Sequence, residues 1–421
     1  MNDTGLSDAG LVLACLCLAP AAHAGLALMQ HGLGRSRSGA HTMLATLCAI
    51  AVAALVFVIV GSHWAGWPGD ASHVVRLGGK IFNYLGVRGP GSGLGQPGST
   101  MRGLTLVFEA YAAALTAMIP ISAAADRWRL AAICASTALL AGFVLPLYMH
   151  AVWGGGWIAS LLHVTDAGGG VVQCVGGLAA LSVVWITGPR IGKYTGGQPN
   201  AIPGHNIIQV LFGCLLALAG WSAFEVAASV LFYRAPEERL VLVPLNALLA
   251  SGAALLAALV YTRLRFRKPD ASICANGWVA GLVAQSVGGC YLSPAMSIVV
   301  GAVAGALAPF LIEMIEFQLL IDDPGGAIAI HLGAGLWGVV AGALFAETGQ
   351  TLSLRVEGAL VVIATLLGLV FPLLHCINLV VAKLVAFRVD RDGDWHGMDI
   401  RELGSGAYPE FVLHADDTIP R

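Results

Sequence analysis

Long apolar stretches that recur along the chain are the feature that most limits its fold. A run of about 20 apolar residues can cross the hydrocarbon core of a bilayer. Lipid offers no partners to backbone N–H and C=O groups, so a spanning segment must satisfy them within a helix. The sequence therefore predicts an all-α integral membrane protein with eleven transmembrane helices. The runs lie near residues 11–31, 42–61, 104–124, 130–149, 167–187, 207–232, 240–261, 273–292, 295–312, 325–346 and 359–386.

The composition agrees with this class and argues against several others. Of the 421 residues, 57% are hydrophobic and 11% are charged, whereas a soluble domain has about 25% charged residues. The nine cysteines are scattered without a Cys-x-x-Cys pair, so we expect small core residues and no metal site. A net charge of -2 predicts no nucleic-acid partner. We find neither a cofactor motif nor a nucleophile–base pair, and therefore expect no cofactor and no enzyme.

The distribution of lysine and arginine predicts the orientation. An odd number of helices places the two ends of the chain on opposite sides. With the N-terminus outside, 15 of the 22 basic residues fall on the inner side, as the positive-inside rule requires. The opening "LVLACLCLAPAAHAG" imitates a signal peptide but lacks its positive n-region, so we expect a first spanning helix. The absence of targeting sequences favours a bacterial cytoplasmic membrane.

Two similar stretches predict an internal repeat. One reads "TDAGGGVVQCVGGLAAL" and begins at Thr165; the other reads "DPGGAIAIHLGAGLWGV" and begins at Asp323. Written without gaps, they place Gln173 opposite His331. Five helices separate them, so the two copies cross in opposite directions, as in inverted repeats with a substrate site at mid-membrane. Chance agreement between Gly- and Ala-rich segments is the alternative.

The predicted organisation has one transmembrane domain and a charged tail. The domain covers 1–387, with inverted repeats at about 9–187 and 205–346 and a final helix at about 359–386. The tail covers 388–421 and lies in the cytoplasm.

Motifs spread over nearly the whole chain resemble the ammonium transporter family of Amt, Mep and Rh proteins. The resemblance implies eleven helices, an outer N-terminus, an inner C-terminus, and a homotrimer with one narrow pore in each subunit. The motifs are "GLALMQHGLGRSRS" at 25–38, "ADRWRL" at 125–130, "HAVWGGGWIAS" at 150–160, "GHNIIQVLFG" at 204–213, "GWSAFEVAAS" at 220–229, "KPDASICANGWVAGLVAQSVGGCYLSP" at 268–294, "DDPGGAIAIHLGAGLWG" at 322–338 and "GMDIRELGSGAYPEF" at 397–411.

The same resemblance implies a mechanism. An outer vestibule attracts ammonium, an aromatic constriction follows, and two mid-pore histidines handle the nitrogen and its proton. Trp153 falls on the vestibule tryptophan, whose ring face would hold a cation; an interfacial tryptophan is the alternative. Phe224 corresponds to one phenylalanine of the constriction, and His331 corresponds to the second pore histidine. The alternative is that both are ordinary core residues.

Several positions depart from the family pattern. Gln173 stands where the first pore histidine is expected. Phe108 and Trp221 are further candidates for the constriction. At three other positions the expected family residue is missing, and a suitable side chain stands at the neighbouring position instead. A shift of one residue along a helix rotates the side chain by about 100°. These pairs are Thr165 beside Asp166 for the vestibule aspartate, Ala228 beside Ser229 for the recruitment serine, and Ala112 beside Tyr111 for the second constriction phenylalanine.

Two acidic residues, Glu109 and Glu225, lie within or near the ends of apolar runs. An ionisable residue there is a functional candidate by default. Glu225 follows the retained Phe224, so its charge would replace the lost recruitment serine. For both glutamates, the alternative to a functional role is that the side chain reaches solvent or makes a structural hydrogen bond.

Three functions remain open from the sequence. The first is ammonium transport with a Gln/His pair and an altered proton path. The second is a sensor-like or non-conducting member that binds ammonium and signals through its tail. The third is a channel for another small solute. The tail resembles the surface where a PII-type signalling protein docks in bacterial relatives, although Leu403 stands where a histidine is common.

Overall fold

The computed structural model describes residues 4–66, 71–77, 79–87, 99–162 and 165–408. Within these residues, ten helical segments are long and apolar enough to cross a membrane. The all-α membrane architecture is thus confirmed. The ten segments are Asp8–Leu33, Ser36–Ala65, Thr100–Ala123, Leu130–Ala159, Gly169–Thr187, Ile207–Tyr233, Glu237–Phe266, Pro294–Gln318, Ile328–Phe345 and Leu352–Leu384.

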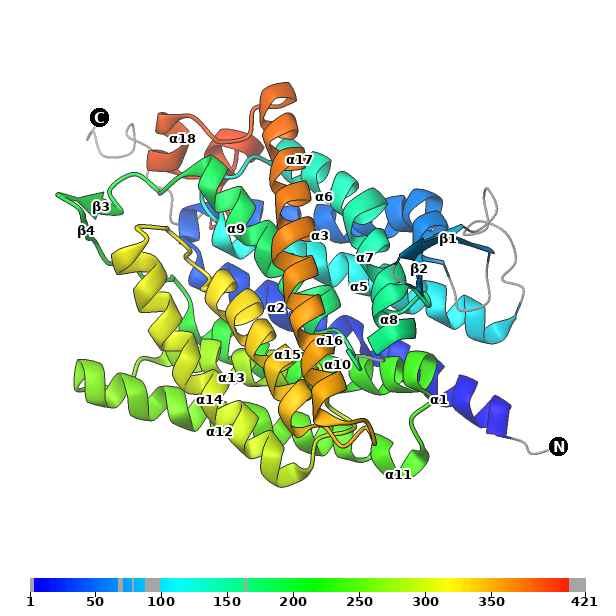
Figure 1. Ribbon diagram of the computed structural model, residues 1–421. Helices are drawn as coiled ribbons and strands as arrows, with labels where there is room; N and C mark the ends of the chain where they lie inside the picture. The colour runs from blue at the N-terminus through cyan, green and yellow to red at the C-terminus, as the bar shows by residue number, and fades with distance from the viewer. Residues whose placement is uncertain (1–3, 67–70, 78, 88–98, 163–164, 409–421) are drawn as a thin grey trace, which may run out of the picture.

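In the first half of the chain, the described residues form nine α-helices, a β-hairpin and short 3₁₀ or π segments labelled η (Figure 1). Strands β1 and β2 pair antiparallel, with a register shift between His73 and Val74. The elements are α1 (Thr4–Leu18), α2 (Pro20–Leu33), η1 (Ser36–Ser38), α3 (Gly39–Val56), η2 (Phe57–Gly61), α4 (Ser62–Ala65), β1 (Ala71–Leu77), β2 (Lys80–Val87), α5 (Thr100–Ala123), α6 (Leu130–Leu139), η3 (Leu140–Val144), α7 (Leu145–Val152), α8 (Trp157–Leu162), η4 (Gly169–Cys174) and α9 (Val175–Thr187).

In the second half, the elements of the described residues are again helical apart from a hairpin of two strands with two residues each. Its elements are β3 (Tyr194–Thr195), β4 (Gln198–Pro199), α10 (Ile207–Tyr233), α11 (Glu237–Leu240), α12 (Leu242–Phe266), α13 (Ala271–Gln285), α14 (Pro294–Glu313), η5 (Met314–Gln318), η6 (Ile328–Gly333), α15 (Ala334–Phe345), α16 (Leu352–Thr365), η7 (Leu366–Val370), α17 (Phe371–Leu384), α18 (Arg391–His396) and η8 (Asp399–Leu403).

The β1–β2 hairpin and α18 lie at opposite ends of the bundle (Figure 1). We call these ends the hairpin face and the tail face. The beginning of α1 is near the hairpin face. The orientation of these two faces relative to the membrane remains a prediction.

The count of eleven helices also stays a prediction, because α13 is short. It contains 15 residues, fewer than the roughly 20 that cross a bilayer. The sequence places this helix at 273–292, but the regular helix ends at Gln285 and turns occupy the next residues. Most of α13 is buried, between helices that include α12 and α14.

Small residues let the longest helices approach closely. A Cβ on Gly220 of α10 would lie 1.9 Å from the backbone nitrogen of Ala22 in α2. A Cβ on Gly305 of α14 would lie 2.0 Å from the carbonyl oxygen of Ala254 in α12. Association of helices in lipid depends on such packing, because lipid provides no hydrophobic drive between them.

The two similar stretches meet near the centre of the bundle. A Cβ on Gly177 would come within 2.5 Å of the backbone nitrogen of Leu332, the residue after His331. A Cβ on Gly335 would come within 2.6 Å of Sγ of Cys174, the residue after Gln173. This reciprocal packing supports the inverted repeat, whose limits remain a prediction.

The tail packs on the bundle through two carboxylates, of which Asp399 is buried and Glu402 is partly buried. Asp399 accepts hydrogen bonds from the backbone N–H groups of Ala40 (3.1 Å) and His41 (2.7 Å), in the first turn of α3. Glu402 accepts one from the N–H of Leu130 (3.0 Å), where α6 begins. Both carboxylates satisfy N–H groups that a helix leaves unpaired at its start. The tail residues "PEF", 409–411, lie outside the described residues.

A buried ion network joins the loops beneath the tail. Arg190 donates to Asp126 (3.0 Å) and, through Nε and Nη2, to Asp322 (2.9 Å each). Arg127 is fully buried and donates to the carbonyl oxygen of Asp322. Burial alone would raise the pKa of Asp322, but the charges of Arg127 and Arg190 and hydrogen bonds from Arg190 lower it to about 2. Asp322 is therefore ionised at neutral pH.

Replacing Arg190 by alanine should destabilise the fold strongly. The change leaves the carboxylates of Asp126 and Asp322 buried without their main partner, which costs about 3–5 kcal/mol. We expect a lower midpoint of thermal unfolding in detergent. Arg265→Ala is the control, since Arg265 pairs with Glu313 at the surface and such pairs contribute about 0–1 kcal/mol. Equal midpoints for the two variants would contradict a structural role for the network.

Candidate functional site

The side chains of Gln173 and His331 meet in the interior of the bundle. Each is 2% exposed, and Nδ1 of His331 lies 2.7 Å from Oε1 of Gln173. An amide oxygen only accepts hydrogen bonds, so the imidazole Nδ1–H is the donor. A neutral ring then carries its lone pair on Nε2. The pairing expected from the ungapped alignment is therefore present as a direct contact.

Two aspartates shape the segments that carry this pair. Asp166 accepts from the N–H groups of Gly168 (2.8 Å), Gly170 (2.9 Å) and Val171 (3.0 Å), where η4 begins. Gly168 has a φ of 140°, which side chains other than glycine rarely adopt. The displaced Asp166 thus lies at the start of the pore segment and caps it.

Asp323 caps the start of η6 in the same way as Asp166 caps η4. Its carboxylate accepts from the N–H groups of Ala327 (3.0 Å) and Ile328 (2.8 Å). Asp166 lies seven residues before Gln173, whereas Asp323 lies eight residues before His331. The first copy is thus one residue shorter, so Thr165 and not Asp166 faces Asp323 in the ungapped alignment. Each aspartate nevertheless accepts from the N–H groups four and five residues after it.

A stacked ring pair lies beside the start of η4. The rings of Phe108 (α5) and Phe224 (α10) are 4.2 Å apart and inclined by 25°, and both are buried. Phe224 also contacts the chain at Gly168, where a Cβ would lie 3.5 Å from its ring. Phe108, one of the candidates for the constriction, thus stacks on Phe224 and lies about one turn before Ala112.

Trp153 belongs to the same aromatic cluster. Its Nε1 donates to the carbonyl oxygen of Asp166 (2.7 Å). Its ring stacks on Phe232, with centroids 4.9 Å apart and planes inclined by 5°. Trp153 is 2% exposed, so Phe232 covers one ring face that was expected to hold a cation. Sequence analysis missed Phe232, although it follows Phe224 by about two helical turns.

The other vestibule candidates separate into two places. Tyr111 packs on His23 of α2, with ring centroids 5.7 Å apart. Thr165, Asp166, Glu225 and Ser229 instead line one small cavity of about 10 Å³. The Ser229 hydroxyl donates to the backbone carbonyl of Glu225 (2.8 Å).

Glu225 is buried and hydrogen-bonded to residues at the end of α13. Nε2 of Gln285 donates to Oε2 of Glu225, and Oγ of Ser286 donates to Oε1. Trp221 donates from Nε1 to the Ser286 hydroxyl (2.9 Å). Trp221 is thus tied to Glu225 through Ser286. Sequence analysis identified neither Gln285 nor Ser286, because nothing in the order of residues predicts their contact with α10. Glu109 is also buried.

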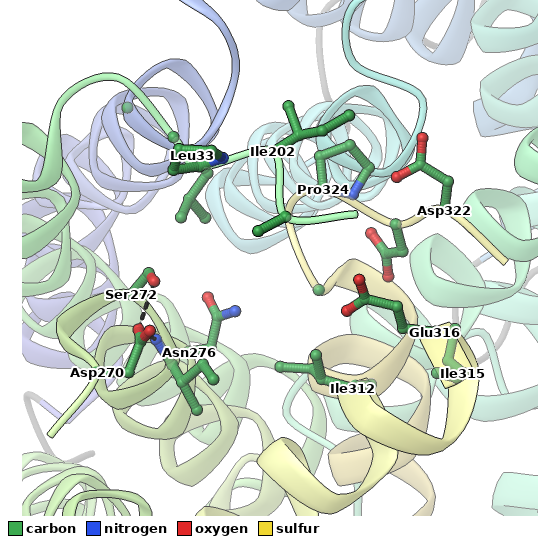
Figure 2. A pocket seen from close by; sticks show the side chains of 18 of the residues that line it. Leu33, Ile202, Asp270, Ser272, Asn276, Ile312, Ile315, Glu316, Asp322 and Pro324 are labelled. Carbon is green, nitrogen blue, oxygen red and sulfur yellow. Dashed lines mark hydrogen bonds between the residues drawn. The ribbon is translucent and has the colours of Figure 1, made fainter. Parts of the chain in front are cut away.

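A larger pocket of about 510 Å³ lies on the tail face. Figure 2 shows acidic and amide side chains around it, including Asp270, Asn276 and Glu316. Its wall also includes Gly326 and Ala329, on the segment that carries His331. This pocket was not predicted, because it is formed by loops far apart in sequence.

Comparison with known proteins agrees with this geometry. The sequence profile described as Ammonium Transporter Family matches residues 10–408. The chain belongs to the ammonium transporter family. It is 30% identical to the ammonium transporter Amt2 of Archaeoglobus fulgidus, over 95% of this chain and 88% of that protein. It is 27% identical to an ammonium transporter of Bacillus subtilis, over 97% of this chain and 100% of that protein.

Solved structures of the family share the fold. A structure titled "Sensor Amt Protein" matches with a TM-score of 0.84 at 25% identity, covering 94% of this chain and 98% of that one. Candida albicans Mep2 matches with a TM-score of 0.77 at 22% identity, over 91% and 86% of the two chains. The protein is thus a multi-pass membrane protein of a family of transport proteins. Among the described residues, no group of three or more His, Cys, Asp or Glu is placed to hold a metal ion.

Removing the carboxylate of Asp166 should destabilise the first pore segment. Asp166→Ala leaves three buried N–H groups at the start of η4 without their acceptor, at a cost of about 2–4 kcal/mol. We expect a lower unfolding midpoint. Thr165→Ala, which changes the adjacent and partly exposed side chain, should leave the midpoint nearly unchanged. A midpoint for Asp166→Ala like that of the native protein would show that the cap is dispensable.

Proposed function

We propose that the protein carries ammonium across the membrane as neutral ammonia and a separately handled proton. The observation that carries the proposal is the 2.7 Å hydrogen bond between Gln173 and His331 in the interior of a family member. The contacts around it outline a route. Phe224 contacts Gly168 at the start of η4, which leads to Gln173, and residues beside His331 border the pocket on the tail face.

The energetics favour separating the proton from the nitrogen. Stripping water from a cation in a low-dielectric pore is very costly, whereas ammonia is neutral. Dissociation of ammonium gives one ammonia and one proton, so the proton needs its own acceptor. His331 offers Nε2 for this purpose. Gln173 has no titration step in the biological range, so it holds the ring by its hydrogen bond while the proton continues through water, His331 and an acidic residue.

We further propose the assembly and orientation that the family resemblance implies. The protein is a homotrimer in a bacterial cytoplasmic membrane. Its hairpin face lies outside and its tail face lies in the cytoplasm, where a PII-type protein docks near the tail. The proposal is supported by the tail that Asp399 and Glu402 hold on the bundle. Leu403, in place of the usual histidine, is the departure that bears on PII docking.

A sensor-like member that binds ammonium without conducting it is the alternative. Two observations favour it. Gln173 cannot relay a proton, and the stacked Phe108 and Phe224, with Trp153 covered by Phe232, leave little room on the hairpin side. The structure titled "Sensor Amt Protein" shows that a fold of this kind occurs in a protein named as a sensor.

Electrophysiology on a solid-supported membrane tests the two functions. Purified protein in liposomes is pulsed with ammonium. We expect a saturable current that falls at least about tenfold in His331→Ala, because the pore loses its proton acceptor. The control is His375→Ala on α17, whose ring packs on Trp185 and Phe371 away from Gln173; it should conduct as the native protein does.

The Gln173→His variant distinguishes the transport function from the sensor function. If the native protein is silent and Gln173→His conducts, Gln173 blocks the proton relay and the sensor function is favoured. A native current that persists in His331→Ala would exclude His331 as the proton acceptor.

A further inference from the structure

We propose that a small cavity between α5, α6, α9 and α17 is a binding site for one water molecule, held by Trp128 and Ser136. The site is separate from the Gln173–His331 pair and does not depend on the proposed function. It adds a buried water that joins the loop before α6 to the last long helix of the bundle.

The cavity has the size of one water molecule and a partly polar wall. Its volume is about 10 Å³, which is close to one water-sized sphere. The wall includes the side chains of Trp128, Ser136, Thr137 and Asn378. Cavities that stay empty in proteins are lined by apolar groups, whereas polar ones hold water. The composition of the wall therefore favours an occupant that forms hydrogen bonds.

The first observation is an indole N–H without an acceptor. Trp128 lies in the turn between α5 and α6 and is 3% exposed. Its Nε1 has no hydrogen-bond partner among the residues that the structure describes. Buried polar atoms are nearly always hydrogen-bonded, so such an atom requires an explanation. An indole N–H can only donate, so the occupant must offer a lone pair.

The second observation is a hydroxyl that lines the same cavity. Ser136 of α6 is 7% exposed, and its Oγ also lacks a partner within the described part of the chain. A helical serine often donates to the carbonyl four residues before it, but this one does not. A hydroxyl both donates and accepts. One molecule in the cavity would thus satisfy Trp128 and Ser136 together.

Acceptors for the hydrogens of a water molecule come from α17 and α5. Nδ2 of Asn378 donates to the hydroxyl of Ser182 (3.0 Å), which leaves Oδ1 as the acceptor of that side chain. Pro120 lies inside α5 and lines the cavity. It has no N–H, so the carbonyl of Thr116 lacks its usual helical donor. Ordered waters are one means by which membrane helices satisfy groups that a proline frees.

The wall favours a neutral occupant over a cation. Of the described residues that line the cavity, none is charged. An ion without an opposite charge is very costly in an apolar interior. The Nε1–H of Trp128 also presents a positive hydrogen to the occupant, which repels a cation. The site therefore differs in chemistry from one that would hold ammonium.

The position of Trp128 connects this site with the tail. Its backbone forms a β-bridge with Arg388, at the start of the tail. Its ring lies 5.8 Å from the ring of Phe387, measured between centroids. Asn378 belongs to α17, the helix that leads into the tail. The water thus joins α6 to both sides of the point where the tail begins.

High-resolution cryo-electron microscopy of the full-length protein in lipid nanodiscs tests the inference directly. At a resolution that shows ordered waters, we expect density for one water within about 3.2 Å of both Nε1 of Trp128 and Oγ of Ser136. In Trp128→Phe, which keeps an aromatic ring and removes the donor, this density should weaken or vanish. A native cavity without density, or a direct hydrogen bond between Trp128 and Ser136, overturns the proposal.

The sign of a change in stability provides a second test. If water is bound, Ser136→Ala removes one of its partners, and the midpoint of thermal unfolding should fall by about 1–2 °C. If the cavity is empty, the same change removes an unsatisfied buried hydroxyl, and the midpoint should stay or rise. A midpoint of Ser136→Ala at or above the native value overturns the site.

Ser251→Ala is the matched control. The Ser251 hydroxyl is also buried in a long helix, α12, and donates to the carbonyl oxygen of Ala247 (2.7 Å). Its replacement measures the loss of a buried serine hydroxyl that has a partner. We expect Ser136→Ala and Ser251→Ala to lower the midpoint by similar amounts, because each removes one satisfied hydroxyl. A fall in Ser251→Ala alone contradicts a bound water.

Discussion

Unpaired backbone N–H groups inside a membrane are the constraint on which this structure depends. The segments η4 and η6, which carry Gln173 and His331, begin within the bundle, where the first N–H groups of a helix need acceptors from the protein. Asp166 and Asp323 supply the acceptors. A carboxylate at a helix start is also favoured by the helix dipole, so one side chain meets both requirements. Gln173 follows its cap by seven residues and His331 follows its cap by eight, so each cap holds the start of the segment that carries one member of the pair.

The same device recurs on the tail face. Asp399 and Glu402 bind the starts of α3 and α6, so the tail is held by backbone groups of the bundle as well as by side chains. The network of Arg190, Asp126 and Asp322 lies below it and ends at the residue before the Asp323 cap. The buried ion network is therefore adjacent in sequence to the cap of η6.

Two buried polar contacts join segments distant in sequence. Gln285 of α13 donates to Glu225 of α10, and His331 of η6 donates to Gln173 of η4. The stacked Phe108 and Phe224 lie next to the start of η4. Glu225 is adjacent in sequence to Phe224, and one residue turns a helical side chain by about 100°. The carboxylate and the ring thus face different neighbours from one helix.

The sequence by itself determined the membrane class, the family and the pairing of Gln173 with His331. Apolar runs have only one backbone solution in lipid, and the repeat aligns the two pore residues without knowledge of the fold. Only the tertiary structure decided that Phe108 stacks on Phe224, that Phe232 covers Trp153, that α13 ends at Gln285, and that Gln285 meets Glu225. Helices that are apolar on both their lipid and protein faces carry little periodic signal. Their rotation, and hence which side chains meet, is set by close packing between residues distant in sequence.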